Sequence, residues 1–496
     1  TVIVSAGGEV SDIKKVVSPV LVNDKNASLY HIDFSFDEQC LGGSAFAQSL
    51  GKVGDDVPTV KNPEYFADAF NAIQELINRS WILAGHDISA GGLITTLLEM
   101  CFANTKGGLH INLHDICKGG DIVKTLFAEN PGVVIEVSDE HKFEFKEFME
   151  EQGIGYAKIG YPVEDSREIE IVYPRDSKTS SYNFDIDALR DVWYKTSYLL
   201  DRKQSFNGKA KERFENYKKQ PLEMKFPKTF TGKLAQYGLN PDRREPSGVK
   251  AAIIREKGTN GEREMAYMLY LAGFDVKDVM MTDLITGRET LEDINLIVFC
   301  GGFSNSDVLG SAKGWAGAFL FNPKAKEAQD KFYAREDTLS LGICNGCQLM
   351  VELGLTGAKG VKMLHNDSHK FESGFLSLDI PQNSSVMFGS LSGSKLGIWV
   401  AHGEGKFHLP EAESNYNVIA KYNYAGYPAN PNGSDYHVAG ICSADGRHLC
   451  MMPHLERAFF PWQNAWYPAD RKADEVTPWI EAFVNARKWV EKKVKK

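Results

Sequence analysis

The chain has 496 residues, 43% of them hydrophobic and 25% charged, so it is long enough for at least two domains whose cores need no disulfide or metal. Its formal net charge of −10 and pI of about 5.7 argue against general binding to nucleic acids or membrane surfaces. The eight cysteines are scattered, and no signal peptide or bilayer-length apolar run is evident, so we expect a protein of the reducing cytoplasm.

Residues 1–175 are predicted to form a first domain of mixed strands and helices. Alternating or continuous apolar runs predict strands at Leu29 to Phe34 and Val133 to Val137. Apolar residues at helical spacing predict amphipathic helices at Tyr65 to Ser80 and Glu140 to Glu151.

Residues 176–247 are predicted to be a helical segment followed by a linker. From Asp185 to Gln220 the pattern is helical and highly charged, and from Pro221 to Gly248 it is rich in Pro, Lys and Gly without periodicity. Three aromatic residues in the helical part predict a face that docks on another element: Trp193, Tyr194 and Tyr198.

Residues 248–496 alternate short apolar strands with helices, which predicts a doubly wound, mostly parallel, flavodoxin-like sheet. The site of such a sheet lies at the carboxyl ends of its strands. Strands after about Gly374 look antiparallel, and an amphipathic helix is expected near the end, at Pro478 to Lys493. The earlier elements are expected at Val249 to Ile254, Glu262 to Ala272, Leu296 to Cys300, Pro323 to Tyr333 and the strand ending at Ile343.

The most informative stretch runs from Leu341 to Met350. It places Cys344 between the end of an apolar strand and the start of a helix, with Gly342 and Gly346 on either side. This arrangement predicts a sharp turn of the nucleophile-elbow kind, with a thiol in place of the hydroxyl. The positive end of the helix would favour the thiolate.

Three other interpretations of Cys344 remain open on this stretch alone. Free cysteine is usually a small buried hydrophobe. Cys344 and Cys347 also form a C-x-x-C, which occurs in redox pairs and zinc sites. The chain holds no second C-x-x-C for zinc, and a thioredoxin-like pair would normally follow the first strand of its own domain.

Two further segments favour the nucleophile. The apolar strand that begins at Leu296 runs into Gly301 and Gly302, which leaves backbone N–H groups unobstructed, as an oxyanion hole requires. Another apolar strand leads to His454, with Glu456 two residues on. A cysteine, a histidine to activate it and a carboxylate to orient the histidine are the parts of a thiol acyl-transfer site.

These segments and two others resemble the class I, triad-type glutamine amidotransferase domain of the phosphoribosylformylglycinamidine synthase family. The resemblance implies Cys344 as nucleophile, His454 as base and Glu456 as the residue that orients it. The family usually has Pro where this chain has Leu455, a change that removes no catalytic group. The motifs are G-x-C-N-G-C-Q, G-G-F-S-x-x-D from Gly301, A-H-G-E-G-K from Ala401, Y-P-A-N-P-N-G-S from Tyr427 and M-M-P-H-x-E-R.

A glutamine pocket is expected beside this triad, with backbone N–H groups near Gly302 and Asn345 holding the oxyanion. The pocket residues suit a small zwitterion better than a peptide: Gly302, Phe303, Gln348, His402, Gly403 and Glu404. The alternatives are another cysteine hydrolase or protease of related topology, and an inactive regulatory remnant. The intact cysteine, histidine and glutamate argue against the remnant.

A Ser-x-Gly-Gly motif at a predicted helix start is the clearest feature of the first domain. Open N–H groups at Gly91 and Gly92, with the Ser89 hydroxyl, could bind phosphate, and Asp87 could hold Mg²⁺ on it. A plain helix cap by Asp87 or Ser89 is the favoured interpretation from the residues alone.

With Leu41-Gly42-Gly43-Ser44-Ala45-Phe46-Ala47, this motif resembles the C-terminal domain of aminoimidazole ribonucleotide synthetase-like ATPases. It matches the second such unit of the same synthases. The resemblance implies a structural nucleotide, ATP or ADP with Mg²⁺, although Ala90 stands where Asp is frequent.

The resemblance covers essentially the whole chain and implies the reaction of the full-length enzyme. That enzyme converts formylglycinamide ribonucleotide, glutamine and ATP to the amidine, glutamate, ADP and phosphate. The chain begins at Thr1 without methionine, so we expect a C-terminal piece whose main partner is the missing N-terminal synthetase half. Alone it should lack synthetase activity, and neither nucleic acid nor a membrane is an expected partner.

Overall fold

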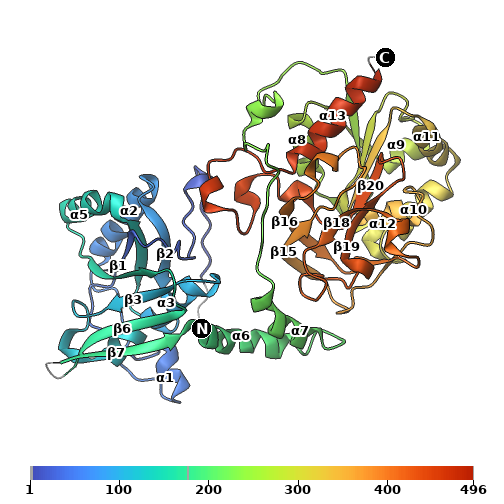
Figure 1. Cartoon of the computed structure of the whole chain (residues 1–496). Helices are drawn as coiled ribbons and strands as arrows, with labels where there is room; N and C mark the ends of the chain where they lie inside the picture. The colour runs from blue at the N-terminus through green and yellow to red at the C-terminus, as the bar shows by residue number, and fades with distance from the viewer. Residues whose placement is uncertain (1–3, 176–177, 495–496) are drawn as a thin grey trace. The chain divides into compact units, whose positions relative to one another are not determined.

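The computed structural model describes residues 4–175 and 178–494. The chain divides into two compact units, the first ending at Ser197 and the second beginning at Tyr198 (Figure 1). Within the described ranges, no helix has the length and apolar character needed to cross a membrane.

The first unit is built on a seven-stranded sheet in the order β2-β4-β1-β5-β3-β6-β7. All neighbouring strands are antiparallel except β3 and β6, which are parallel. The strands are β1 (Ala27–Asp33), β2 (Ile82–Ile88), β3 (Gly108–Asn112), β4 (Gly132–Ser138), β5 (Ala157–Val163), β6 (Glu168–Arg175) and β7 (Lys178–Asp185).

Helices cover both faces of this sheet. Leu29 and Tyr30, neighbours on β1, point to opposite faces and belong to two separate apolar cores. The Tyr30 core is closed by α2 (Pro63–Asn78) and α5 (Lys142–Glu151), and the Leu29 core by α3 (Gly92–Phe102) and α4 (Ile122–Phe127). The predicted strands and helices of this region are confirmed, with ends shifted by a few residues.

Strand β7 was not expected from the sequence. It pairs with β6 along its whole length, but most of its side chains are polar and exposed. An edge strand of this kind is held by backbone hydrogen bonds and leaves no apolar pattern to detect.

The charged helical segment is confirmed, but as two helices. They are α6 (Ile186–Asp201) and α7 (Lys209–Asn216), separated by a turn in which Gly208 has a φ of 71°. Trp193 lies against Phe102, with ring centroids 5.4 Å apart, whereas Tyr198 stacks on Phe214 at 4.8 Å. Trp193 and Tyr198 therefore dock on different elements.

The second unit contains a nine-stranded sheet in the order β10-β8-β11-β13-β20-β19-β18-β15-β16. The first five strands are parallel and the remaining pairs antiparallel, which confirms the predicted doubly wound sheet with an antiparallel extension. The strands are β8 (Lys250–Arg255), β10 (Asp275–Met280), β11 (Leu296–Phe299), β13 (Leu339–Ile343), β15 (Glu372–Asp379), β16 (Lys395–His402), β18 (Asn417–Tyr422), β19 (Val438–Cys442) and β20 (His448–Met451).

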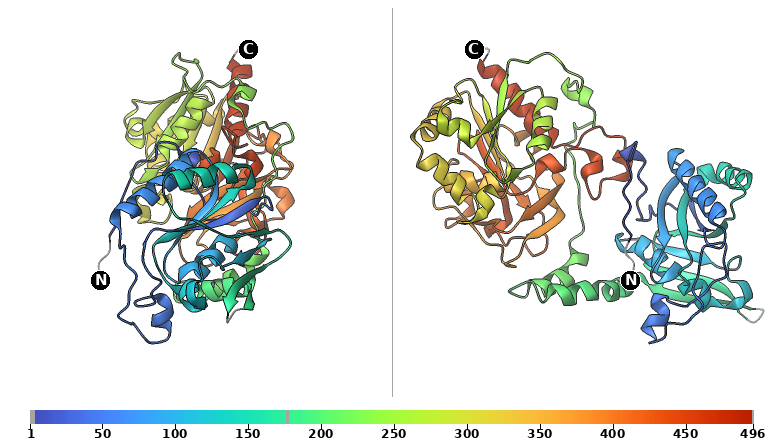
Figure 2. Two further views of the ribbon diagram at one scale, coloured as in Figure 1. Left: turned by 90° about the vertical axis from the view of Figure 1, so that its left-hand side faces the viewer. Right: turned by 180° about the vertical axis from the view of Figure 1, so that it is seen from behind.

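Helices flank this sheet on both sides (Figure 2). On one side lie α8 (Glu262–Leu271) and α13 (Ile480–Val494); on the other lie α9 (Met281–Thr286), α10 (Lys313–Leu320), α11 (Pro323–Ala334) and α12 (Asn345–Glu352). Strands β11, β13 and β20 are adjacent in the sheet. Their carboxyl ends therefore bring Gly301, Cys344 and the segment of His454 to one place.

Candidate active site

Cys344 occupies the sharp turn that the sequence predicted. Strand β13 ends at Ile343 and α12 begins at Asn345, and Cys344 between them has a φ of 52°, which is uncommon for a residue with a side chain. A Cβ at Gly346 would lie 2.1 Å from the carbonyl oxygen of Phe299. Only glycine lets α12 begin this close to β11.

His454 and Glu456 form a buried pair. His454 Nδ1 donates to Glu456 Oε1 over 2.6 Å, and each residue is 1% exposed. The His454 N–H donates to the carbonyl oxygen of Trp399, on β16, at 2.8 Å. Leu455, which stands where the family usually has Pro, is fully buried in the apolar core and leaves the pair in contact.

The glycine strand end lies against both the cysteine and the histidine. A Cβ built on Gly301 would be 2.9 Å from His454 Cε1 and 3.4 Å from Cys344 Cβ. The Cys344 sulfur lies 3.5 Å from the carbonyl oxygen of Ala401, at the end of β16. Four segments thus converge on the sulfur. The Cys344 N–H donates to Met451 O and is not available to an oxyanion.

The electrostatics of the two buried histidines are opposite. Burial lowers the pKa of His454, but the Glu456 carboxylate and the Cys344 sulfur outweigh it and raise that pKa to about 9. Burial, together with the neighbouring His454, lowers the pKa of His402 to about 3. His454 therefore carries a proton at neutral pH, and His402 is a neutral imidazole whose two ring nitrogens have no hydrogen-bond partner among the described residues.

Cys347 lies beneath the elbow in the packed core. It is fully buried, and burial, with Cys450 beside it, raises the pKa of its thiol well above the usual range. Cys347 and Cys344 are both free cysteines, so the C-x-x-C is not a disulfide here. The described residues contain no cluster of three or more His, Cys, Asp or Glu side chains that could hold a metal ion.

The predicted glutamine-pocket residues are connected by hydrogen bonds. Asn345 Oδ1 accepts from the Ser304 N–H at 3.2 Å, and its Nδ2 donates to Gln348 Oε1 at 3.0 Å. Gln348 Nε2 then donates to the carbonyl oxygen of Glu404 at 2.8 Å. This series of hydrogen bonds connects the loop after Gly302 to the turn at residues 402–405.

The remaining predicted residues lie on the two segments that these hydrogen bonds connect, the loop at Gly302 and the turn at residues 402–405. Gly302 has a φ of 121°, a conformation that favours glycine. Phe303 is 47% exposed, with its ring 6.0 Å from that of Phe371. Gly403 lies between His402 and Glu404 in the turn.

Sequence reasoning missed two asparagines that hold this turn, Asn366 and Asn432. Asn432 belongs to the Y-P-A-N-P-N-G-S motif, which marked the family resemblance but did not indicate what Asn432 does. Asn366 follows a short strand, β14 (Lys362–Leu364), and nothing in its local sequence marks it.

In the first unit, the N–H group of Gly91 is already occupied. Glu129 Oε1 accepts from the Gly91 N–H at 2.8 Å and from the Ala45 N–H at 2.7 Å, so one carboxylate joins the two glycine motifs. Gly91 caps α3 without any side-chain cap, so the predicted cap by Asp87 or Ser89 is not formed either. Glu129 takes the place that the sequence suggested for a phosphate oxygen.

Asp87 and Ser89 are both exposed, and Gly92 is buried against the carbonyl oxygens of Leu126 and Ala128. The Asp87 carboxylate lies 3.2 Å from His86 Nδ1, a ring nitrogen and not a second carboxylate that would help to hold Mg²⁺. The residues present here do not fit a Mg²⁺-phosphate group.

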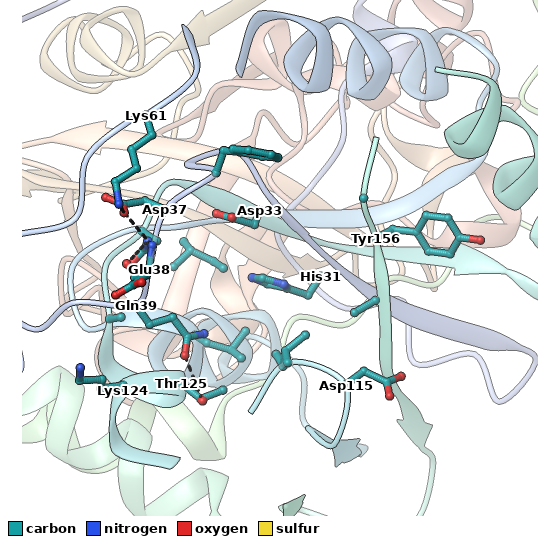
Figure 3. Close-up of a pocket in the computed structure, with 18 of the residues that line it drawn as sticks. His31, Asp33, Asp37, Glu38, Gln39, Lys61, Asp115, Lys124, Thr125 and Tyr156 are labelled. Atoms are coloured by element: carbon teal, nitrogen blue, oxygen red, sulfur yellow. Dashed lines mark hydrogen bonds and ion pairs between the residues drawn. The ribbon is translucent and has the colours of Figure 1, made fainter. Parts of the chain in front are cut away.

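A cavity of about 750 Å³ lies beside this motif in the first unit, with Ile88 and Leu93 in its wall. Figure 3 shows Asp37 paired with Lys61 at one end and Thr125 bonded to Gln39 at another. Five carboxylates and only two lysines line it, and one of the lysines, Lys61, is already paired with Asp37, so the cavity does not favour an unpaired anion.

Replacing Glu129 with alanine should lower the free energy of unfolding of the first unit by about 1–3 kcal/mol, because two N–H groups lose a charged acceptor. Glu129→Gln should cost less, since its amide oxygen can still accept. The measurement is chemical unfolding of the whole chain, with Glu151→Ala, at the exposed end of α5, as control. If ADP with Mg²⁺ stabilised the wild type, and stabilised Glu129→Ala still more, this assignment would be contradicted and the phosphate site restored.

Two family models match the chain. Residues 248–490 match a CobB/CobQ-like glutamine amidotransferase domain, and residues 37–173 match the C-terminal domain of AIR synthase related proteins. The probable phosphoribosylformylglycinamidine synthase of Arabidopsis thaliana is 38% identical, over 99% of this chain and 36% of its own length. The human phosphoribosylformylglycinamidine synthase is 36% identical, over 99% of this chain and 38% of its own length. A solved structure of PurLQS from Thermotoga maritima is 24% identical and covers 50% of this chain and 99% of its own, with a TM-score of 0.37.

The chain is thus a glutamine amidotransferase domain that follows an AIR synthase-like domain. It belongs to the phosphoribosylformylglycinamidine synthase family. It spans a little over a third of the length of the curated relatives that it matches.

Proposed function

We propose that this chain is the glutaminase part of a phosphoribosylformylglycinamidine synthase. It hydrolyses glutamine through a thioester on Cys344, and the ammonia serves the ATP-dependent conversion of formylglycinamide ribonucleotide to the amidine. The observation that carries the proposal is the buried His454–Glu456 pair beside the sulfur at the carboxyl ends of parallel strands. The synthetase step belongs to the full-length enzyme, whose N-terminal half is the expected partner.

In the proposed mechanism, the Cys344 thiolate attacks the carboxamide carbon of glutamine. N–H groups of Gly302 and Asn345 stabilise the oxyanion. The His454 imidazolium gives its proton to the departing ammonia, and the thioester remains on the sulfur. The neutral His454 then takes a proton from water, whose oxygen attacks the thioester carbonyl carbon; the C–S bond breaks, glutamate leaves, and the Cys344 thiolate and the His454 imidazolium are restored.

The proposed division places an AIR synthetase-like domain at residues 1–175, a helical segment and linker at 176–247, and the amidotransferase at 248–496. The matched ranges, 37–173 and 248–490, support it. ATP and Mg²⁺ are needed by the synthetase step of the full-length enzyme, and Asp87, Ser89, Gly91 and Gly92 do not fit them. Eight free cysteines suit the reducing cytoplasm that we expect.

The test is glutamate formation from glutamine by the purified chain and by a full-length synthase that contains it. We expect hydrolysis of glutamine in both, and none of a peptide that carries an internal glutamine. Cleavage of the peptide would favour the alternative hydrolase, and no hydrolysis of either substrate by the full-length synthase would favour an inactive remnant.

A further inference from the structure

Side chains help to hold the turn at residues 402–405, in addition to the pairing of His402 with β15 and a bond from the Asn366 N–H to the carbonyl oxygen of Gly403 at 2.9 Å. Asn366 and Asn432 are both fully buried. Asn366 Nδ2 donates to the carbonyl oxygen of His402 at 2.7 Å, while its Oδ1 accepts from the Gly405 N–H at 3.0 Å. Asn432 Nδ2 donates to the carbonyl oxygen of Gly405 at 2.7 Å. Asn366 thus bridges both ends of the turn.

This turn carries contacts of the proposed glutamine pocket. The carbonyl oxygen of Glu404 accepts from Gln348 Nε2 at 2.8 Å, and Gln348 lies on α12, which follows Cys344 directly. The residue before the turn, Ala401, places its carbonyl oxygen 3.5 Å from the Cys344 sulfur. A shift of the turn would move the pocket relative to the sulfur and leave the histidine–glutamate pair intact.

The loop that carries Asn366 is in turn held by the helical segment before the amidotransferase domain. Asn207, in the turn between α6 and α7, donates from Nδ2 to the carbonyl oxygen of Asp367 at 2.8 Å. Lys370 pairs with Asp201, at the end of α6, over 2.5 Å. All these residues belong to the second unit. A continuous path therefore runs from the helical segment through the loop to the turn.

We propose that Asn366 is a positioning residue for glutamine binding, and that residues 201–207 fix its place. The proposal rests on the proposed glutaminase function. Asn366 touches no reacting atom; it acts through the turn, so its loss should weaken the binding of glutamine more than it slows the chemical steps. The segment before residue 248 is then a working part of the glutaminase and not only a tether.

The test is the kinetics of glutamine hydrolysis by full-length variants. Asn366→Asp keeps the size of the side chain but sets an oxygen against the carbonyl oxygen of His402. We expect KM for glutamine to rise about tenfold, the factor for one net hydrogen bond, while kcat changes by less than about threefold. Asn383→Ala is the matched control, because Asn383 also holds a turn, through Pro381 and Ser385. It should leave KM unchanged.

A second variant tests the path. Asn207→Gly keeps the positive φ of 54° and removes only the bond to Asp367. It should raise KM for glutamine on its own. Combined with Asn366→Asp, it should raise KM by a smaller further factor than it does alone, because both substitutions act on one loop. The proposed role of Asn366 is overturned if a folded Asn366→Asp has an unchanged KM, or if only its kcat falls. The proposed path is overturned if the effects of the two substitutions on KM are fully additive in the double variant. If Asn366→Asp does not fold, Asn207→Gly decides by its KM alone. If the wild-type enzyme forms no glutamate from glutamine, the proposed glutaminase function itself is refuted, and this outcome is distinct from the others.

Discussion

Cys344→Ala is expected to abolish glutamine hydrolysis, with a fall of about 10³-fold or more, because no other described group can form the acyl intermediate in its place. The other cysteines near the site do not substitute for it: burial raises the pKa of Cys347 and of Cys300 well above the usual range, so neither supplies a thiolate. Glutamate formation from glutamine is the measurement. In a full-length synthase, synthesis from added ammonia should remain.

Cys347→Ala is the matched control for this substitution. Cys347 lies three residues after Cys344, in the first turn of α12, but it is fully buried in the core. Its loss should therefore leave a small cavity at a modest stability cost and keep most of the activity. Glutamine hydrolysis by Cys344→Ala near the wild-type rate would refute the assignment. So would equal losses in both variants while both remain folded, because the effect would then not be specific to the nucleophile.

The parts of the site that could be predicted from the sequence are those encoded by consecutive residues. The elbow needs an apolar strand, a reactive residue and glycines in fixed order, and Gly346 is required because Phe299 O leaves no room for a Cβ. His454 and Glu456 are two residues apart, so their contact needs only one turn of chain. The parallel strands are fully buried, which leaves continuous apolar runs.

The parts that could not be predicted depend on segments far apart in the sequence. The Glu129 carboxylate reaches Gly91 and Ala45 across 38 and 84 residues, and no local pattern distinguishes it from a surface acid. Asn366 likewise reaches His402 across 36 residues. Such bonds satisfy buried backbone groups wherever the fold leaves them, so the residue that supplies them follows from the packing and not from the local pattern.

Glu456→Gln is expected to move the alkaline limb of the pH profile of kcat/KM to lower pH. In the wild type, the pKa of His454 is raised to about 9, so the imidazolium is present at neutral pH and is lost as the pH rises through 9. Burial opposes this charge, and Glu456 is its largest support. The amide cannot offer the negative charge, so burial then dominates, the pKa of His454 falls, and the proton needed by departing ammonia is lost at lower pH.

The variant His454→Ala should lose about 10²–10⁴-fold in rate across the whole pH range, because proton transfer itself is removed. Glu481→Gln is the control, because Glu481 is also a buried glutamate, 7% exposed. It accepts hydrogen bonds from Tyr237 and Ser390, and it lies on α13, on the other side of the sheet from α12. Its profile should match the wild type. An alkaline limb that stays near pH 9 in Glu456→Gln would show that Glu456 does not support the imidazolium, and would leave it only the role of orienting the ring.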